Sequence, residues 1–181
     1  MKPLVAVLCA VALALPASDV CADMRGELPP FSGRSKTWGE AKVALTVQPT
    51  VIGDPLPEEL IFVLYSTGRV IYSTPSGRES ALRREPISYF TVTLTAAEQA
   101  ALIGDLPLDR VDSRTMGRHG DDGSTICIEV WPRGNQKYNC VSGTSTNNPV
   151  LPPDMLKIWK RLSNFESKQA APWKPEAPKA R

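Results

Sequence analysis

The spacing of apolar residues predicts several strands in the first half of the chain. Residues 41–47 alternate in hydrophobicity, as a half-buried strand does. Four apolar positions of this run are expected to share one face: Ala41, Val43, Leu45 and Val47. Residues 60–65 are continuously apolar, and a Ser-Thr-Gly turn separates them from the β-rich run 69–73, so they predict a hairpin. Its first strand has no polar face, which indicates a central place in the sheet. Residues 87–94 predict a further strand.

Two helices are predicted from capping signals and from apolar residues at helical spacing. Thr95 and Glu98 form the pattern of a capping box, in which each side chain accepts a hydrogen bond from the other residue's amide. This helix is expected to end near Ile103, before a glycine. The second helix is expected over residues 153–165, after Pro152. Its apolar stripe consists of Met155, Trp159 and Leu162, widened by Leu156, Ile158 and Phe165.

Residues 124–143 (STICIEVWPRGNQKYNCVSG) predict two strands joined by a tight turn. If residues 133–134 are the two-residue loop, Cys127 lies directly opposite Cys140. The four-residue loop 132–135 is the alternative, because it begins with a proline that cannot donate a hydrogen bond. Both loops place the two cysteines opposite each other.

The order of these elements predicts the fold class. Hairpin, connection and helix follow one another twice, with one extra strand in the first copy. We therefore expect an α+β fold, an antiparallel sheet built from hairpins with two helices packed on one face. Three residues of the 124–143 hairpin are expected to face the helices: Ile126, Ile128 and Val130. Three others are expected on the opposite face: Cys127, Glu129 and Trp131.

The N-terminal residues 1–22 have the three parts of a secretory signal peptide, which are a basic start, a short apolar run and small residues after it. We expect cleavage after Ala22, although Ala17 also fits. The apolar run is shorter than the roughly 20 residues that a spanning helix needs. No later segment is long and apolar enough to span a bilayer, so no transmembrane segment is expected in the mature chain.

Proline content and loss of periodicity divide the rest of the chain. We expect a flexible arm over residues 23–39, a single α+β domain over 40–166 and a Pro- and Lys-rich tail over 167–181. The tail is expected to be disordered or extended, except that Trp173 favours packing back onto the domain.

The expected cleavage site determines which cysteines remain. Cys9 leaves with the signal peptide, and cleavage after Ala22 also removes Cys21. Cys127 and Cys140 then form an even pair, which is typical of a disulfide in an exported protein. We therefore predict a structural disulfide between them and a periplasmic or secreted location.

Composition narrows the classes of partner and cofactor. The chain has 21 Lys and Arg against 19 Asp and Glu, a net charge of +2, and these charges are interspersed. This pattern gives no electrostatic footprint for nucleic acid, so no nucleic-acid partner is expected. The sequence contains neither a Gly-x-Gly-x-x-Gly nor a Walker motif, so we predict no cofactor.

His119 is the single histidine, and it lies in the polar, glycine-punctuated loop 110–123. Beside Asp121 and Asp122 it is a candidate general base for a periplasmic or secreted hydrolase. The alternative is a solvated turn, since Gly and Asp supply unusual backbone angles. With the cysteines paired, too few ligands remain for zinc, and the loop, including Asp112, lacks the EF-hand spacing for calcium. We therefore predict no metal site.

The remaining candidate for function is the outward face of the 124–143 hairpin. Glu129, Trp131 and Tyr138 are expected to stand there beside the disulfide. Exposed aromatic side chains favour an interface, although the N-terminal arm or the segment around Trp173 is an alternative cover. The leading hypothesis is an exported, non-catalytic binding protein of the inhibitor, immunity or envelope-accessory type. Its partner is expected to be a protein or an envelope component.

Overall fold

The computed structural model describes residues 34–35, 38–51, 54–55, 58–74, 87–117, 123–132 and 135–174. The strands in these ranges are β1 (Arg34–Ser35), β2 (Gly39–Gln48), β3 (Thr50–Val51), β4 (Asp54–Pro55), β5 (Glu59–Tyr65), β6 (Arg69–Ser73), β7 (Tyr89–Thr93), β8 (Arg114–Met116), β9 (Ser124–Val130), β10 (Lys137–Thr144) and β11 (Ala171–Pro172). The helices are α2 (Ala96–Ile103), the 3-10 helix η1 (Leu108–Arg110) and α3 (Pro153–Leu162).

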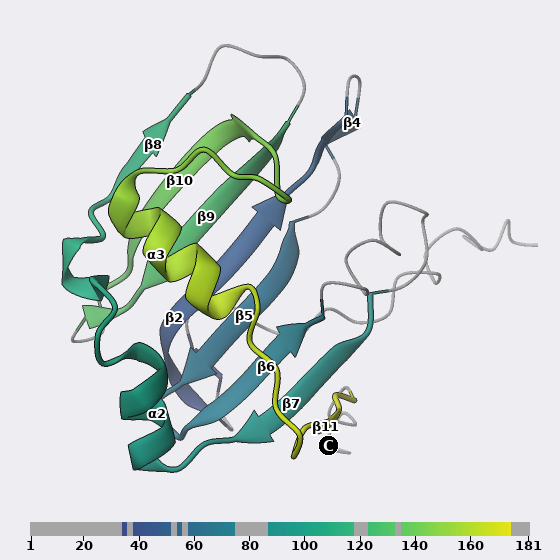
Figure 1. Cartoon of the computed structure of the whole chain (residues 1–181), viewed down its shortest axis with the longest axis vertical. Coiled ribbons are helices and arrows are strands. Elements are labelled where there is room, and N and C mark those ends of the chain that lie inside the picture. The colour runs from purple at the N-terminus through teal and green to yellow at the C-terminus, as the bar shows by residue number, and fades with distance from the viewer. Residues whose placement is uncertain are drawn as a thin grey trace, which may run out of the picture.

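The strands form one open, mostly antiparallel sheet in the order β11–β7–β6–β5–β2–β9–β10–β8 (Figure 1). β1 pairs with β2 outside this path, and β3 pairs with β4 in a separate ribbon. Among the described strands, β8 and β10 are the pair that runs parallel. The predicted α+β fold class is confirmed, and β5 has the central place that its apolar sequence indicated.

The larger apolar cluster fills the space between one face of the sheet and both helices. Figure 1 shows α3 lying across β9 and β2 on this face. The sheet contributes, among others, Val43, Leu45, Val47, Ile126, Ile128 and Val130. The helices contribute Leu102 from α2 and Met155, Ile158, Trp159 and Leu162 from α3. The predictions that two helices cover one face, and that alternate residues of β9 point toward them, are confirmed.

The capping box at the start of α2 is also confirmed. The amide of Glu98 donates to Thr95 Oγ1 at 3.3 Å, and the amide of Thr95 donates to Glu98 Oε2 at 2.8 Å. The Thr95 hydroxyl also donates to Glu98 Oε2 at 2.8 Å. The two hydrogen bonds that Thr95 donates to the Glu98 carboxylate lower the pKa of this carboxyl. The helix ends at Ile103 with Gly104 as its C-cap, as expected. In contrast, α3 ends at Leu162, before the predicted end at residue 165.

A bulge in β2 overturns one detail of the predicted strand. The pairing of β2 with β5 shifts between Ala41 and Val43, so Lys42 is an extra residue without an opposite partner. The extra residue reverses which side chains face the helices. Ala41 therefore packs on the opposite face from Val43, and the prediction that they share a face is wrong.

β8 lies inside the region predicted to be a polar loop. Residues 114–116 pair with Asn139, Cys140 and Val141 of β10. The prediction of loop is therefore wrong for this part of 110–123. A three-residue strand with two exposed polar side chains has no alternating pattern, so only its pairing with β10 identifies it.

A second apolar cluster covers the opposite face of the sheet. It consists of Trp38, Ala41, Ala44, Leu60, Val63, Tyr65, Ile71 and Tyr89. The ring of Trp38 packs edge-on against Tyr65, with 5.4 Å between ring centroids, and the Arg69 guanidinium lies 5.0 Å from the centroid of the Trp38 ring. Burial raises the pKa values of Tyr65 and Tyr89 to about 12. The sheet is thus apolar on both faces over its central strands.

The segment after α3 connects the two clusters around the β7 edge of the sheet. Phe165 packs edge-on against Phe62 and Tyr72 in the larger cluster. β11 then pairs antiparallel with β7, and the amide of Trp173 donates to the carbonyl of Tyr89 at 2.8 Å. The Trp173 ring lies edge-on to Tyr89 in the second cluster. Residues 165–173 of this segment therefore contribute side chains to both faces of the sheet.

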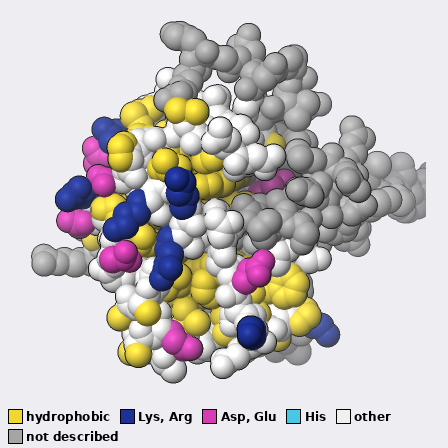
Figure 2. All heavy atoms as spheres, viewed as in Figure 1, with side chains coloured by type: hydrophobic (Ala, Val, Ile, Leu, Met, Phe, Trp, Pro, Cys, Tyr) yellow, Lys and Arg dark blue, Asp and Glu magenta, His cyan; other side chains and the backbone are white. Residues whose placement is uncertain are grey.

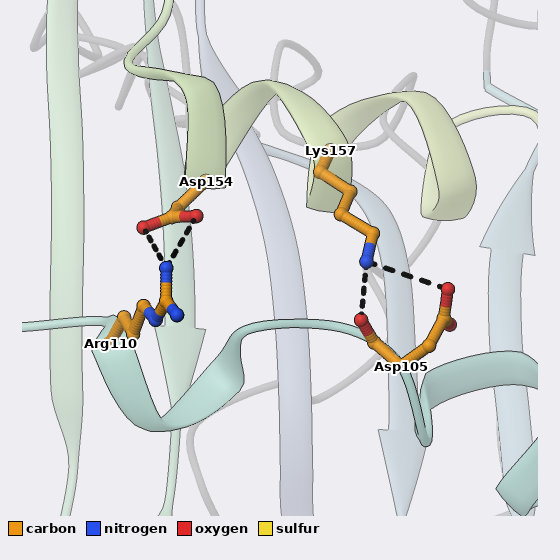
Figure 3. A network of polar contacts seen from close by, with 4 residues as sticks. All are labelled: Asp105, Arg110, Asp154 and Lys157. Atoms are coloured by element: carbon orange, nitrogen blue, oxygen red, sulfur yellow. Dashed lines mark hydrogen bonds and ion pairs between the residues drawn. The ribbon is translucent and has the colours of Figure 1, made fainter.

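Two ion pairs fasten the connection after α2 to α3 (Figure 3). Arg110 Nη1 lies 3.4 Å from Asp154 Oδ1, at the start of α3. Lys157 Nζ lies 3.5 Å from Asp105 Oδ2 and also donates to the Asp105 carbonyl. All four side chains are well exposed, and such pairs contribute roughly 0–1 kcal/mol each. They therefore set the position of α3 beside α2 more than they stabilise the fold.

Candidate binding surface

The β9–β10 hairpin has the predicted register and carries the disulfide. Cys127 lies directly opposite Cys140, their Cα atoms are 4.2 Å apart, and their sulfur atoms are bonded. One step further along the strands, Thr125 Oγ1 donates to Ser142 Oγ at 3.0 Å. The structural disulfide is confirmed, and such a bond is consistent with an oxidising extracellular or periplasmic location.

Glu129 and Tyr138 form the next cross-strand pair beyond the disulfide, on the face away from the helices. Ala44 of β2 lies on the other side of Glu129. Glu129 is half-buried, and Gln136 Nε2 donates a hydrogen bond to its Oε2. Tyr138 is 40% exposed, one of the most exposed large apolar side chains in the described part of the protein. The pair therefore combines a shielded carboxylate with an open aromatic ring.

The environment of Glu129 raises its pKa. Burial is the main cause, since it removes water from the charged carboxylate, and the negative charge of Glu58 adds to it. The hydrogen bond from Gln136 acts in the opposite direction without cancelling the rise. Glu58 is held above the sheet by Thr46, whose Oγ1 donates to Glu58 Oε1 at 2.6 Å. This surface thus contains two carboxylates, and one of them is stabilised in its protonated form.

The Glu129→Gln variant is expected to be more stable than the wild-type protein at neutral pH. A raised pKa in the folded state means that stability is full below the unfolded-state pKa and is lost as the pH rises through the folded-state pKa. Glutamine at position 129 still accepts the hydrogen bond from Gln136, but it carries no charge that burial would desolvate. The variant therefore does not lose stability as the pH rises. Thermal unfolding from about pH 4 to about pH 8 measures the difference, which should shrink toward the acid end.

Glu98→Gln is the matched control of opposite sign. The pKa of Glu98 is lowered in the folded state, so its carboxylate contributes stability above the unfolded-state pKa, and this contribution is lost as the pH falls through the lowered value. The variant should therefore be less stable than the wild type at neutral pH. If Glu129→Gln follows the wild-type pH profile, the Glu129 carboxylate is not shielded as described.

Trp131 stands apart from the other two residues of the predicted surface. Its amide donates to the carbonyl of Lys42 at 3.3 Å, and its half-buried side chain packs against the second apolar cluster. Trp173 packs against the same cluster. The structure therefore brings Glu129 and Tyr138 together, while Trp131 forms the margin between this pair and the aromatic part of the sheet face.

Glu58, Thr46 and Gln136 are the members of this surface that sequence reasoning missed. Alternation along β2 places Thr46 on the face opposite to Leu45, and a polar residue inside an otherwise apolar strand was a usable signal. That signal has no meaning until β2 is paired with β9, because only this pairing puts Thr46 directly opposite Cys127. Glu58 follows a proline-rich loop and has no pattern of its own.

The candidate hydrolase residues His119, Asp121 and Asp122 lie outside the described residues. Asp112, the fourth member considered for that loop, forms an ion pair with Arg114 at 3.1 Å and accepts a hydrogen bond from Asn139. Within the described ranges, no group of three or more His, Cys, Asp or Glu side chains is placed to hold a metal ion. The same ranges contain no helix that could cross a bilayer.

Comparison with known proteins adds no further information on the surface. The chain matched no protein-family model, no curated protein and no solved structure. Assignment of function therefore depends on the geometry of this face of β9 and β10.

Proposed function

We propose that the protein is an exported binding protein that engages its partner on the outer face of the β9–β10 hairpin. The observation that carries this proposal is the Glu129–Tyr138 pair, held one step from the Cys127–Cys140 disulfide. A cross-linked hairpin loses little conformational freedom when a partner binds, so less of the contact energy is lost in ordering the binding surface. Tyrosine is enriched among the residues that dominate binding energy.

The chemistry of the pair defines what a partner must present. The Tyr138 ring offers an open apolar surface with a hydroxyl at its end, and Glu129 beside it offers a shielded carboxyl group. A partner with an apolar side chain flanked by a hydrogen-bond donor or acceptor fits both groups. A folded protein of the exporting compartment, or a protein component of the envelope, meets this description. An inhibitor, an immunity-type protein and an envelope accessory factor are the functional types of this kind.

Site-specific photo-crosslinking tests the proposal. A photoreactive phenylalanine analogue at position 138, in the protein exported by its own cell, is expected to form a covalent adduct with one partner. The same analogue at Asp109, an exposed position on η1, is the control and should form no such adduct. Tyr138→Ala should abolish co-purification of that partner with only a small decrease in the melting temperature, since Tyr138 belongs to neither apolar cluster.

Two results would contradict the proposal. The first is an adduct pattern at position 138 that is indistinguishable from the one at position 109. The second is a partner whose recovery is unchanged by Tyr138→Ala. Either result would remove the outer face of β9 and β10 as the docking surface.

A further inference from the structure

β7 is the last full strand at one edge of the sheet, and the two-residue strand β11 covers it. All of β7 pairs with β6, from Tyr89 opposite Ser73 to Thr93 opposite Arg69. β7 (YFTVT) contains no charged residue and no proline, and its pairing with β6 shows no bulge. Charges, prolines and bulges are the features that usually keep an edge strand from pairing with another chain. The protection of β7 therefore depends on β11.

Three residues of β7 direct their backbone groups toward this edge: Tyr89, Thr91 and Thr93. The carbonyl of Tyr89 accepts a hydrogen bond from the amide of Trp173 at 2.8 Å. Backbone groups of successive residues in a strand point to opposite sides, so Thr91 and Thr93 point the same way as Tyr89. The register of β11 begins at Ala171, which lies opposite Thr91. β11 therefore covers only part of this row of backbone groups.

Pro172 makes β11 the end of the sheet. The amide of Trp173 points to β7, so the preceding residue, Pro172, presents its backbone to the opposite side. A proline has no N–H, so a strand of another chain would find no donor there. β11 thus covers β7 without offering an edge that extends the sheet further.

The segment that carries β11, residues 166–174, is held by few contacts. Figure 1 shows the chain running from the end of α3 over β6 and β7 to β11, and Figure 2 shows hydrophobic side chains at the surface along this path. None of its side chains is fully buried, and both residues of β11 are exposed. Its half-buried residues are Ser167, whose amide donates to the Tyr72 hydroxyl at 3.3 Å, Ala170 and Trp173. A segment with so few buried contacts opens at a lower free energy than the core does.

The sequence of β7 is complementary to itself in one antiparallel register. A two-fold axis at Thr91 places Tyr89 of one copy opposite Thr93 of the other, and Phe90 opposite Val92. All three residues that point to the edge then lie in hydrogen-bonded pairs. The two faces also match, because Phe90 and Val92 lie on the side of the larger apolar cluster and Tyr89 lies in the second cluster. A second copy of the chain therefore completes the row that β11 covers only in part.

We propose that residues 166–174 are a removable cap, and that β7 pairs with β7 of a second copy when this cap is displaced. The chain is monomeric with β11 in place and forms a two-fold dimer with one continuous sheet without it. The cap and the second copy compete for the same backbone groups, so binding or cleavage of the segment after α3 promotes dimerisation. This inference does not depend on the Glu129–Tyr138 surface, which lies on β9 and β10.

Two shortened chains test the cap. The chain that ends at Ala170 lacks β11 and Trp173, whereas the chain that ends at Lys174 keeps both and is the matched control. Size-exclusion chromatography with light scattering, over a range of protein concentrations, measures the mass of each. The chain ending at Ala170 should reach twice the monomer mass as its concentration rises. The chain ending at Lys174 and the full chain should keep the monomer mass.

Cysteine cross-linking tests the register, in the expected mature chain that begins at residue 23. In the chain ending at Ala170, Thr91→Cys should form a disulfide between two copies, because opposed residues of a hydrogen-bonded pair have Cα atoms about 5.5 Å apart. Thr93→Cys is the matched control, since its two copies would lie about 14 Å apart along the strands and should not cross-link. In the full chain Thr91→Cys faces Ala171 and should not cross-link, but adding Trp173→Ala should release the cap and produce the cross-linked dimer.

Three results would overturn the proposal. The first is a chain ending at Ala170 that stays monomeric, and the second is a chain ending at Lys174 that dimerises equally well. The third is equal cross-linking at positions 91 and 93, which indicates association without the two-fold register. If circular dichroism shows that the chain ending at Ala170 is unfolded, the full chain with Thr91→Cys and Trp173→Ala decides, and absence of its cross-linked dimer overturns the proposal.

Discussion

Replacing Trp159 by alanine is expected to lower the free energy of unfolding by about 3–5 kcal/mol. Trp159 is 4% exposed and lies in the larger apolar cluster, where α3 packs on the sheet. Alanine would leave a cavity between α3 and the sheet, and the cost of this cavity adds to the lost burial of the ring because the surrounding side chains relax only partially. Equilibrium unfolding in urea, monitored by circular dichroism, measures the loss as a lower midpoint at an unchanged slope.

Lys160→Ala is the matched control for this prediction. Lys160 is the next residue of α3 and is exposed, so its replacement should change stability by no more than about 0.5 kcal/mol. If Trp159→Ala were as stable as Lys160→Ala, α3 would not pack on the sheet as described. The predicted fold would then lack one of its two helices on that face.

The second large effect is expected for the double variant Cys127→Ser/Cys140→Ser. The disulfide closes a short loop, since the two cysteines are 13 residues apart in sequence. Constraint of the unfolded chain by a loop of this size contributes roughly 3 kcal/mol or less. The loss should appear in urea unfolding under non-reducing conditions, and non-reducing mass spectrometry of the wild type should show no free thiol at either position.

A reducing agent provides the control for the disulfide. It should destabilise the wild-type protein by about as much as the double variant loses, and it should have no effect on the double variant itself. Equal stability of the wild type and the double variant without reductant would contradict the prediction. Free thiols in the exported protein would contradict the oxidising compartment as well.

Local patterns were reliable where neighbours in sequence are also neighbours in space. The capping box of Thr95 and Glu98 is formed by residues three apart, so its geometry is contained in that one segment. The register of the β9–β10 hairpin follows from its turn, which puts Cys127 opposite Cys140 in either form of the loop. The disulfide and the faces of β9 could therefore be derived without the rest of the fold.

Features that depend on residues far apart in the sequence could not be predicted from local patterns. The polar run of β8 becomes a strand because β10 offers it an edge, and its own sequence carries no period. The position of Ala41 depends on a bulge that appears only when β2 pairs with β5. The same distinction holds within the candidate site. The hairpin register predicted the pair Glu129 and Tyr138, whereas Thr46 and Glu58 come near them only because β2 pairs with β9.

The sequence by itself determined the two main hairpins, the two helices and the cysteine pairing, because each of these depends on contacts within one hairpin or one helix. The order of these elements then determined the class of fold. The tertiary structure alone decided the order of strands, the second apolar cluster and the place of Trp131 and Trp173 in it. The physical reason is that the hydrophobic effect is non-directional. It favours burial of an apolar side chain but does not specify which surface buries it. In the same way, the pKa of Glu129 is raised by burial between β2 and β10 and by the negative charge of Glu58, and no single segment contains that information.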